Sequence, residues 1–259
     1  MYIDKFKKIV IKVGSSILVD EKGKPKKKWL QEFAKDIKHL IKKRKKIVIV
    51  SSGAIAMGCQ YLNIKKNGLK IDKSQAVASI GQIELMNFYK KTFDENNIKI
   101  SQILLTLDDT ERRRRSINAR RTIDNLLAMG IIPIVNENDV VATEELDLNF
   151  GDNDLLAVYL ATLIGADQLF LLTVAPGLLK EESTKKGNHS IVVEQVKELT
   201  EEILRHCLPI TSAGGKGGME SKARSAGMAM SFGIDTYILN GKSPPSMIAR
   251  CRSSSALPI

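Results

Sequence analysis

Two short clusters of acidic and amide residues are the part of this sequence best suited to chemistry. They are Asn136-Glu137-Asn138-Asp139, which follows an apolar run at 131–135, and Gly151-Asp152-Asn153-Asp154, which opens a helix-like run at 155–163. Carboxylate and amide oxygens accept hydrogen bonds from an ammonium group, and amide NH2 groups donate to a carboxylate. The pair of clusters therefore predicts an amino-acid ligand, although either one alone is also typical of a strand exit or a helix cap.

Three glycine-containing turns favour the handling of phosphate. Lys12-Val13-Gly14-Ser15-Ser16 and Ser51-Ser52-Gly53-Ala54 each follow an apolar run, and a third turn at 214–219 (GGKGGM) precedes a helical segment that carries Lys222. Glycine lets backbone N–H groups approach an anion, and a following helix N-terminus adds partial positive charge. No turn matches GxxxxGK[ST] or GxGxxG, and a single turn of this kind is weak evidence.

Lys12 and Lys222 are candidates for charge stabilisation. A lysine in an apolar strand is costly unless its charge is matched, so Lys12 is either functional or snorkels at the strand end. Lys222 falls one turn into its helix, where it either returns toward the glycine turn or lies on a solvated face. Two lysines beside glycine turns suit phosphoryl transfer, which depends on positioning and charge neutralisation.

The arginines at 112–115, 120 and 121 indicate either a phosphate or subunit contact or a solvated, salt-bridged face.

Apolar β-branched runs alternate with helical segments along the chain. This alternation predicts an α/β fold, a mostly parallel central sheet with helices on both faces in three layers, with ligands at the carboxyl ends of the strands. The strands are expected at 9–13, 47–50, 100–105, 131–135, 168–172 and 236–239. The helices are expected at 29–43, 54–62, 73–93, 113–129, 154–163, 194–205 and 218–231, with Gly130 and Gly165 as helix-ending glycines.

The composition sets the class of protein. A chain of 259 residues predicts one large domain over 1–259. Within it, the polar segment at 180–190 is expected to be a mobile surface excursion and the tail at 242–259 to be poorly structured. The 40 Lys+Arg against 29 Asp+Glu give a net charge of +11. The lysines are scattered and not interleaved with aromatic residues, which disfavours nucleic-acid binding. Three widely spaced cysteines, no signal-like start and no long apolar run predict a cytoplasmic protein with no membrane partner.

Taken together, the motifs resemble those of the glutamate 5-kinases, a family of the amino acid kinase superfamily. The resemblance covers roughly residues 7–240. It is carried by the first glycine turn and by the segments IVIVSSGAIAMG (47–58), SIGQ (79–82), SQILLT (101–106), NAR (118–120), IPIVNENDVVA (132–142), GDND (151–154) and GKGGMESK (215–222). The glycine turns are shared across the superfamily, whereas the NEND and GDND pair is specific to the glutamate 5-kinases.

The resemblance implies ATP- and Mg²⁺-dependent transfer of the γ-phosphoryl group to the side-chain carboxylate of L-glutamate, the first step of proline biosynthesis. It implies inhibition by proline and a homo-oligomer, a dimer or a tetramer. By position, Lys12 and Lys222 would stabilise the transferring phosphoryl group and Asp154 would hold both lysines. Ser52, Gly53, Asp139 and Asn153 would bind glutamate. No residue is assigned as a metal ligand, and the nucleotide would be bound by Lys12, Gly14, Thr173, Val174, Gly215, Lys216, Gly217, Gly218, Met219 and Lys222.

The sequence also departs from the family pattern. Val174 follows Thr173 where the family has Asp, Glu181-Glu182 replaces Asp-Pro, and Lys216 stands where Thr is common. The sequence is expected to lack the C-terminal PUA domain that many bacterial members carry. Two alternatives remain at this point: a kinase of the same superfamily acting on acetylglutamate, carbamate or a nucleotide monophosphate, and a non-catalytic ligand-binding relative.

Overall fold

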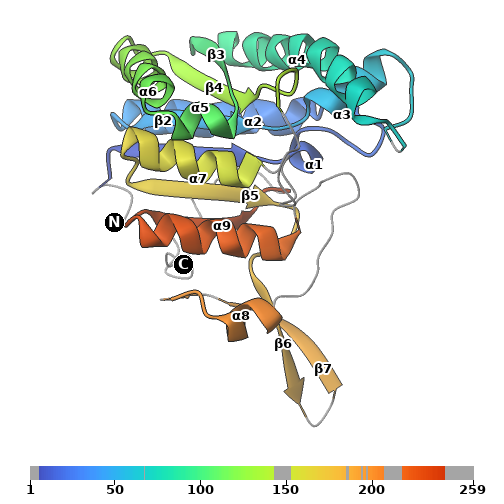
Figure 1. Ribbon diagram of the computed structural model, residues 1–259, viewed down its shortest axis with the longest axis vertical. Helices are drawn as coiled ribbons and strands as arrows, with labels where there is room; N and C mark the ends of the chain where they lie inside the picture. Colours follow the sequence, from blue (N-terminus) through green and yellow to red (C-terminus); the bar gives the residue numbers. More distant parts are fainter. Residues whose placement is uncertain are drawn as a thin grey trace.

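A parallel sheet forms the centre of the molecule in this computed structural model, which describes residues 6–66, 68–142, 153–184, 187–193, 195–196, 198–206 and 218–242. Within that part of the chain the sheet has six strands in the order β3-β4-β2-β1-β5-β8, and every neighbouring pair is parallel (Figure 1). The strands are β1 (Lys8–Val13), β2 (Lys46–Ser51), β3 (Ile100–Leu105), β4 (Ile132–Glu137), β5 (Gln168–Thr173) and β8 (Asp235–Asn240). All their carboxyl ends therefore lie along one edge.

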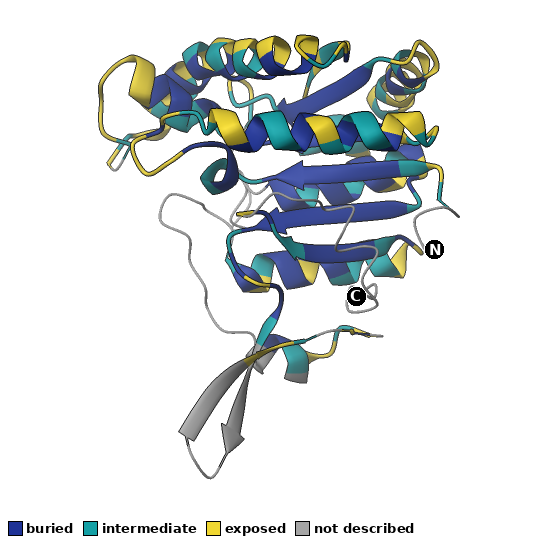
Figure 2. Ribbon diagram, turned by 180° about the vertical axis from the view of Figure 1, so that it is seen from behind, coloured by how far each residue is buried: buried dark blue, intermediate teal, exposed yellow. Residues whose placement is uncertain are grey.

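Helices cover both faces of this sheet, as Figures 1 and 2 show from opposite sides. One face packs against α1 (Ser15–Leu18), α2 (Lys27–Lys42), α3 (Ala54–Tyr61) and α4 (Ile71–Asp94). The other packs against α5 (Leu107–Glu111), α6 (Arg113–Ala128), α7 (Asn153–Ile164) and α9 (Met219–Ser231). Helix α8 (Glu201–His206) lies beyond α9 and contacts α9 and the strand β6 (Leu179–Thr184) (Figure 1). The predicted three-layer α/β fold is confirmed. In the described part of the chain, no helix is long and apolar enough to cross a bilayer.

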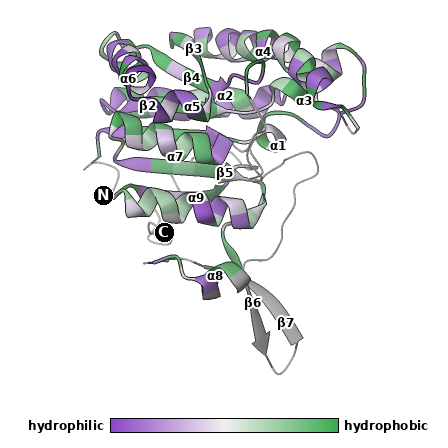
Figure 3. Cartoon of the chain, viewed as in Figure 1, coloured by the Kyte–Doolittle hydropathy of each residue, from purple (hydrophilic) through white to green (hydrophobic). Residues whose placement is uncertain are grey.

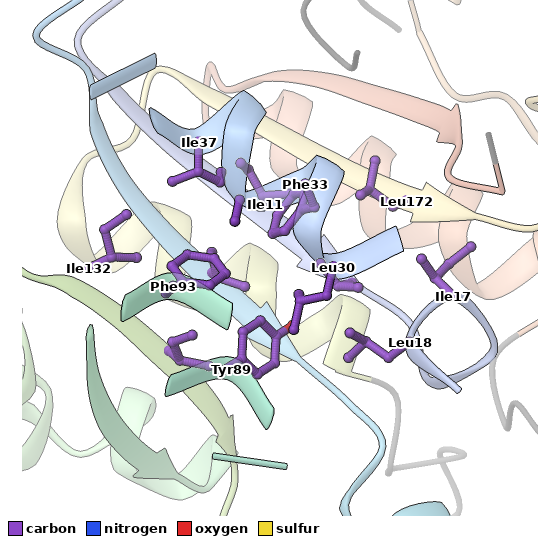
Figure 4. Close-up of a cluster of buried hydrophobic side chains, with 14 of the residues drawn as sticks. Ile11, Ile17, Leu18, Leu30, Phe33, Ile37, Tyr89, Phe93, Ile132 and Leu172 are labelled. Atoms are coloured by element: carbon purple, nitrogen blue, oxygen red, sulfur yellow. The ribbon is translucent and has the colours of Figure 1, made fainter. Parts of the chain in front are cut away.

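The alternation of side chains along the strands divides the core into two clusters. In β1, Ile9 and Ile11 pack with the α2 and α4 side, whereas Val10 packs with the α7 and α9 side. Figure 4 shows the first cluster, in which the ring centroids of Phe33 and Phe93 lie 6.4 Å apart. Burying each such side chain stabilises the fold by roughly 1.5–3 kcal/mol. Lys12 follows the alternation of Val10 and is therefore directed to the α7 and α9 face.

The six predicted strands are all present, and Gly130 and Gly165 have positive φ at the ends of α6 and α7. The helix predicted at 194–205 is wrong in its first half. Residues 195–196 and 198–200 are not helical, because α8 begins only after Thr200, whose side-chain oxygen accepts from the N–H of Ile203. Local capping therefore overrode the weak helical periodicity of this segment.

The segment at 180–190, predicted to be a mobile surface excursion, contains two strands that the sequence did not predict. β6 (Leu179–Thr184) and β7 (Gly187–Val192) pair antiparallel as a separate hairpin that extends away from the main sheet (Figure 1). The polar sequence has no apolar run to indicate a strand, and the pairing is one of backbone groups. The predicted poorly structured tail at 242–259 lies outside the described residues, apart from Lys242.

Helices α3 and α4 approach each other through two glycines. A Cβ atom on Gly81 would lie 1.8 Å from the carbonyl oxygen of Ala54 and 2.5 Å from the backbone nitrogen of Gly58. A Cβ on Gly58 would in turn lie 2.2 Å from the carbonyl oxygen of Val77. Because the atoms that would clash belong to the backbone, no side-chain rotation relieves the contact, and the residues at 58 and 81 fix the separation of the two helices.

Gly81→Ala should therefore destabilise the protein. We expect the free energy of unfolding to fall by at least about 1–3 kcal/mol, as measured for overpacked cores. Chemical denaturation measures this change. Ser79→Ala is the control, because Ser79 is exposed on the same helix and bonds only its own helix backbone. Equal unfolding midpoints for Gly81→Ala and the wild type would contradict the close packing.

Candidate active site

Helix α7 begins at the carboxyl edge of the sheet, where β4 ends in the first polar cluster. It lies between β4 and β5 in the sequence, crosses the face of the sheet and contacts β1, β2, β4 and β5. Its first residues, Asn153 and Asp154, are both buried, at 5% and 0% exposure. In a parallel sheet this edge is where ligands bind, next to the point where the strand order reverses.

The carboxylate of Asp154 lies between two lysines. The Nζ atom of Lys12 is 2.6 Å from Oδ1 of Asp154, and the Nζ atom of Lys222 is 2.8 Å from Oδ2. Lys12 and Lys222 are only 4% and 8% exposed. Lys12 therefore does not snorkel to solvent and Lys222 does not lie on a solvated helix face. Two ammonium groups that share one buried carboxylate are held in fixed positions next to the strand ends.

The electrostatics of this group favour an ionised Asp154. Burial by itself would raise the pKa of Asp154, but the charges of Lys12 and Lys222 and their hydrogen bonds outweigh it and hold the pKa below its ordinary value of 3.8. The carboxylate therefore remains charged at neutral pH. A buried carboxylate matched by two cations serves to orient those cations rather than to exchange protons.

The first two glycine turns meet beside Lys12. A Cβ atom on Gly14 would lie 3.9 Å from the Nζ atom of Lys12, so the backbone of this turn runs past the ammonium group. The backbone N–H of Ser52 donates to the carbonyl oxygen of Val13 at 3.1 Å, which joins the second turn to the first. Gly53 has a φ of 122°, a backbone conformation that residues other than glycine rarely adopt.

The two acidic-amide clusters meet through Asn153. Its Nδ2 lies 2.6 Å from the carbonyl oxygen of Ser51, 2.7 Å from Oδ1 of Asn136 and 2.9 Å from Oγ of Ser52. These partners belong to β2, β4 and the turn after β2, so the side chain makes tertiary contacts and does not simply cap its own helix. An NH2 group has two hydrogens, and the two shortest contacts account for both. The Ser52 hydroxyl can then donate elsewhere.

Four residues of this network, Asn136, Gln82, Ser51 and Tyr89, were not among the predicted site residues. Asn136 donates through Nδ2 to Oε1 of Gln82 at 2.7 Å, and Oγ of Ser51 lies 3.1 Å from the hydroxyl of Tyr89. Burial raises the pKa of Tyr89 despite its hydrogen bond to Ser51, so its hydroxyl stays protonated. The sequence offered one indication of these residues, because Asn136 and Gln82 lie in the NEND and SIGQ segments that carry the family resemblance. The contact between them spans 54 residues, which a pattern in one sequence does not reveal.

The other predicted site residues lie around this centre or outside the described residues. Thr173 ends β5 and its Oγ1 accepts from the N–H of Ala175 at 3.4 Å, while Val174 packs against the apolar core on the α2 side. Gly218 precedes α9 and Met219 is buried in its first turn, whereas Gly215, Lys216 and Gly217 lie outside the described residues. Asp139 is half-buried in the turn after β4.

The arginine-rich run of α6 lies on the outside of the molecule, and Figure 3 shows α6 as largely hydrophilic. Arg112 and Arg115 form ion pairs with Asp108 and Asp109, and Arg120 lies 3.7 Å from Asp124. All of these arginine side chains are more than half exposed. The geometry is that of a solvated, salt-bridged face, which was the simpler of the two sequence interpretations.

The donor set near Asp154 fits phosphate oxygens better than a bare metal ion. Among the described residues no group of three or more His, Cys, Asp or Glu side chains is placed to hold a metal. Mg²⁺ commonly keeps several waters and binds through substrate phosphates with one or two carboxylates. The site is thus compatible with a Mg²⁺ ion that arrives on a nucleotide.

The fold and this site define a three-layer α/β protein with two buried lysines that share one carboxylate, and the family model described as "Amino acid kinase family" matches residues 7–240. The chain belongs to the amino acid kinase family. The solved UMP kinase from Bacillus anthracis has the same fold, with a TM-score of 0.61 at 15% identity over 95% of this chain and 92% of that one.

Two relatives of greater sequence similarity are both named glutamate 5-kinase. The chain is 52% identical over 241 residues to the glutamate 5-kinase of Pelagibacter ubique, which covers 93% of this chain and 65% of the relative. It is 42% identical over 240 residues to that of Sinorhizobium fredii, which covers 93% and 60%. The matches thus span 60–65% of the length of these two curated relatives.

Proposed function

We propose that the protein is a glutamate 5-kinase, which transfers the γ-phosphoryl group of ATP to the side-chain carboxylate of L-glutamate. The observation that carries this proposal is the pair of buried lysines fixed by Asp154 beside an amide cluster suited to an amino acid. The similarity to curated glutamate 5-kinases supports the choice of substrate. The reaction belongs to proline biosynthesis, and we expect it to proceed in the cytoplasm.

In this proposal Lys12 and Lys222 stabilise the negative charge of the transferring phosphoryl group. Phosphoryl transfer needs positioned cations more than covalent help, and a fixed ammonium requires little reorganisation during the reaction. Asp154 is a positioning residue that orients both lysines. Gly14, Gly218 and the adjoining residues Gly215, Lys216, Gly217 and Met219 are proposed to hold the nucleotide phosphates, with Thr173 and Val174 at the nucleoside end.

Glutamate is proposed to lie against Ser52, Gly53, Asp139 and Asn153. The carboxylate of Asp139 suits the ammonium group of the substrate, and the Ser52 hydroxyl suits a substrate oxygen. When bound with the nucleotide, Mg²⁺ would neutralise phosphate charge. The glutamate carboxylate then needs no general base, since it is already ionised at neutral pH.

A steady-state assay of ADP release tests the proposal. L-Glutamate, N-acetylglutamate, carbamate and UMP are supplied in turn with ATP and Mg²⁺. The proposal predicts turnover that requires L-glutamate. Preferred turnover of another acceptor would instead identify a different kinase of the family, and binding of glutamate without ADP release would indicate a non-catalytic relative.

Asn153→Ala should weaken glutamate binding selectively. The change removes the link between the ends of β2 and β4 and leaves polar groups unpaired, at a cost of about 1–3 kcal/mol each. We expect the KM for glutamate to rise more than the KM for ATP in the same assay. A larger rise in the KM for ATP would contradict the assignment of Asn153 to the glutamate side.

Free L-proline is proposed to inhibit by competing with glutamate, because both ligands carry an ammonium group and an α-carboxylate. Initial rates at several fixed proline concentrations should show inhibition that saturating glutamate overcomes. Asp139→Ala should weaken both ligands together. Inhibition that glutamate cannot overcome, or none at millimolar proline, would contradict a shared site.

We also propose a homo-oligomer, a dimer or a tetramer, which size-exclusion chromatography with light scattering would test.

A further inference from the structure

Helix α4 carries a polar stripe that ends in the proposed substrate site. Gln75, Gln82 and Tyr89 are seven residues apart and thus share one face of the helix. Nε2 of Gln75 donates to the carbonyl oxygen of Ala142 at 3.0 Å, Gln82 accepts from Asn136, and the Tyr89 hydroxyl meets Ser51. A single helix face therefore contacts the segment after β4, the end of β4 and the end of β2.

The hydrogen bonds of the amide chain can run in only one direction. The carbonyl oxygen of Ser51 can only accept, so Asn153 must present its NH2 group to it. Asn136 must then present its oxygen to the same NH2 group, and its own NH2 group faces Gln82. Gln82 completes the chain by presenting Oε1 at 2.7 Å. A reversed amide at any of the three positions would place either two NH2 groups or two oxygens against each other.

This direction decides what the site offers to a ligand. Because the NH2 group of Asn153 is used by Ser51 and Asn136, its Oδ1 is the atom that remains to accept a hydrogen bond. An acceptor suits a ligand with an N–H donor such as an ammonium group and gives nothing to a ligand that has no donor at that position. The orientation of Asn153 is supported from one side by Ser51 and from the other by Asn136, whose orientation in turn depends on Gln82.

The packing of α4 holds Gln82 in place. Gln82 is only 9% exposed and follows Gly81, whose lack of a side chain allows contact with the carbonyl oxygen of Ala54. Ala54 begins α3 directly after the Ser52-Gly53 turn of the site. The position of α4 is therefore fixed relative to the same turn that the proposed substrate contacts.

We infer that Gln82 is a positioning residue that orients Asn136 and Asn153 and thereby sets the preference of the site for a ligand with an ammonium group. The inference rests on the proposed function for the identity of the ligand, but not for the direction of the amide chain. Gln82 acts through the two asparagines and does not need to touch the substrate.

Three variants of the full chain test this role. Gln82→Met keeps the size of the side chain and removes the acceptor, whereas Gln82→Glu keeps an acceptor for Asn136. Asn87→Leu removes an exposed amide from the outer face of α4 and serves as the control. For each variant we would measure the KM for glutamate, the KM for ATP and the inhibition constant of glutarate, which is glutamate without its amino group.

Gln82→Met should raise the KM for glutamate about tenfold, the usual consequence of one lost hydrogen bond, and leave the KM for ATP and the inhibition by glutarate unchanged. Gln82→Glu and Asn87→Leu should stay close to the wild type. The inference is overturned if Gln82→Met binds glutamate normally, if it weakens glutarate and glutamate equally, or if Gln82→Glu fails to rescue it.

A second readout requires no ligand and separates this inference from the proposed function. Solvent exchange of the side-chain NH2 hydrogens is followed by NMR in the wild type and in Gln82→Met. Exchange at Asn136 should accelerate about tenfold in Gln82→Met and not in Gln82→Glu, because its acceptor is lost only in the first. Unchanged exchange at Asn136 would overturn the inference. Absence of glutamate kinase activity in the wild type would refute the proposed function alone.

Discussion

Lys222→Met should lower kcat by about 10²–10³, the usual effect of removing one group that stabilises charge in a transition state. Lys222 lies 2.8 Å from Asp154 and is almost fully buried, so methionine can fill its space without providing a charge. Asp154 retains its contact with Lys12 in this variant. The loss of turnover should therefore be much larger than the loss of stability.

Steady-state kinetics and chemical denaturation on the same preparations measure the two effects. Lys90→Met is the matched control, because Lys90 forms an exposed ion pair with Asp94, and such pairs contribute roughly 0–1 kcal/mol. Lys12→Met should behave like Lys222→Met. Near-normal turnover in both site variants would show that these lysines do not stabilise the transferring group.

Asp154→Asn should be the most destabilising of the site variants. It leaves two buried ammonium groups without the carboxylate that they share, and breaking a buried ion pair costs about 3–5 kcal/mol. Urea denaturation at neutral pH should show a loss of this size, together with loss of activity. Asp94→Asn is the surface control and should change the stability little.

The pH dependence gives a second test of Asp154. Its pKa in the folded protein lies below the ordinary value of 3.8, so the carboxylate contributes stability that is complete above that value. The contribution is lost as the pH falls below 3.8 toward the pKa of the folded state. The stability difference between the wild type and Asp154→Asn should therefore shrink on acidification below that value. A difference that is small at neutral pH, or independent of pH, would contradict the paired geometry.

The sequence predicted the sheet well because its inner strands, such as β2 and β5, are buried on both faces and read as uninterrupted apolar runs, as at 47–50. Lys12 was informative for the same reason, since a charge in such a run requires a partner. The hairpin β6–β7 was missed because its pairing involves the backbone and leaves no apolar pattern. The helix expected at 194–205 was shortened by a cap at Thr200, a local effect at a position where the periodicity is weak.

The site shows the limit of sequence reasoning more clearly. Residue types at strand ends predicted an amino-acid ligand, because all parallel strands end at one edge. The partners of Asn153 depend on how α4, β2 and β4 pack, which residue order alone does not specify. Gln82 is 54 residues from Asn136 in the sequence. The position of α4, which carries Gln82, depends on the close packing of Gly81 against α3 and not on any chemistry of Gly81 itself.

In the proposed reaction, this site transfers a phosphoryl group from ATP to the side-chain carboxylate of glutamate. The most direct measurement is to trap the acyl phosphate product with hydroxylamine and to identify the hydroxamate by mass spectrometry, with ATP, Mg²⁺ and L-glutamate as the reactants. We expect a γ-glutamyl hydroxamate in amounts that match the ADP released, formed about 10²–10³-fold more slowly with Lys222→Met. ADP release without a hydroxamate, or a hydroxamate at the α-carboxyl group, would contradict the proposed reaction.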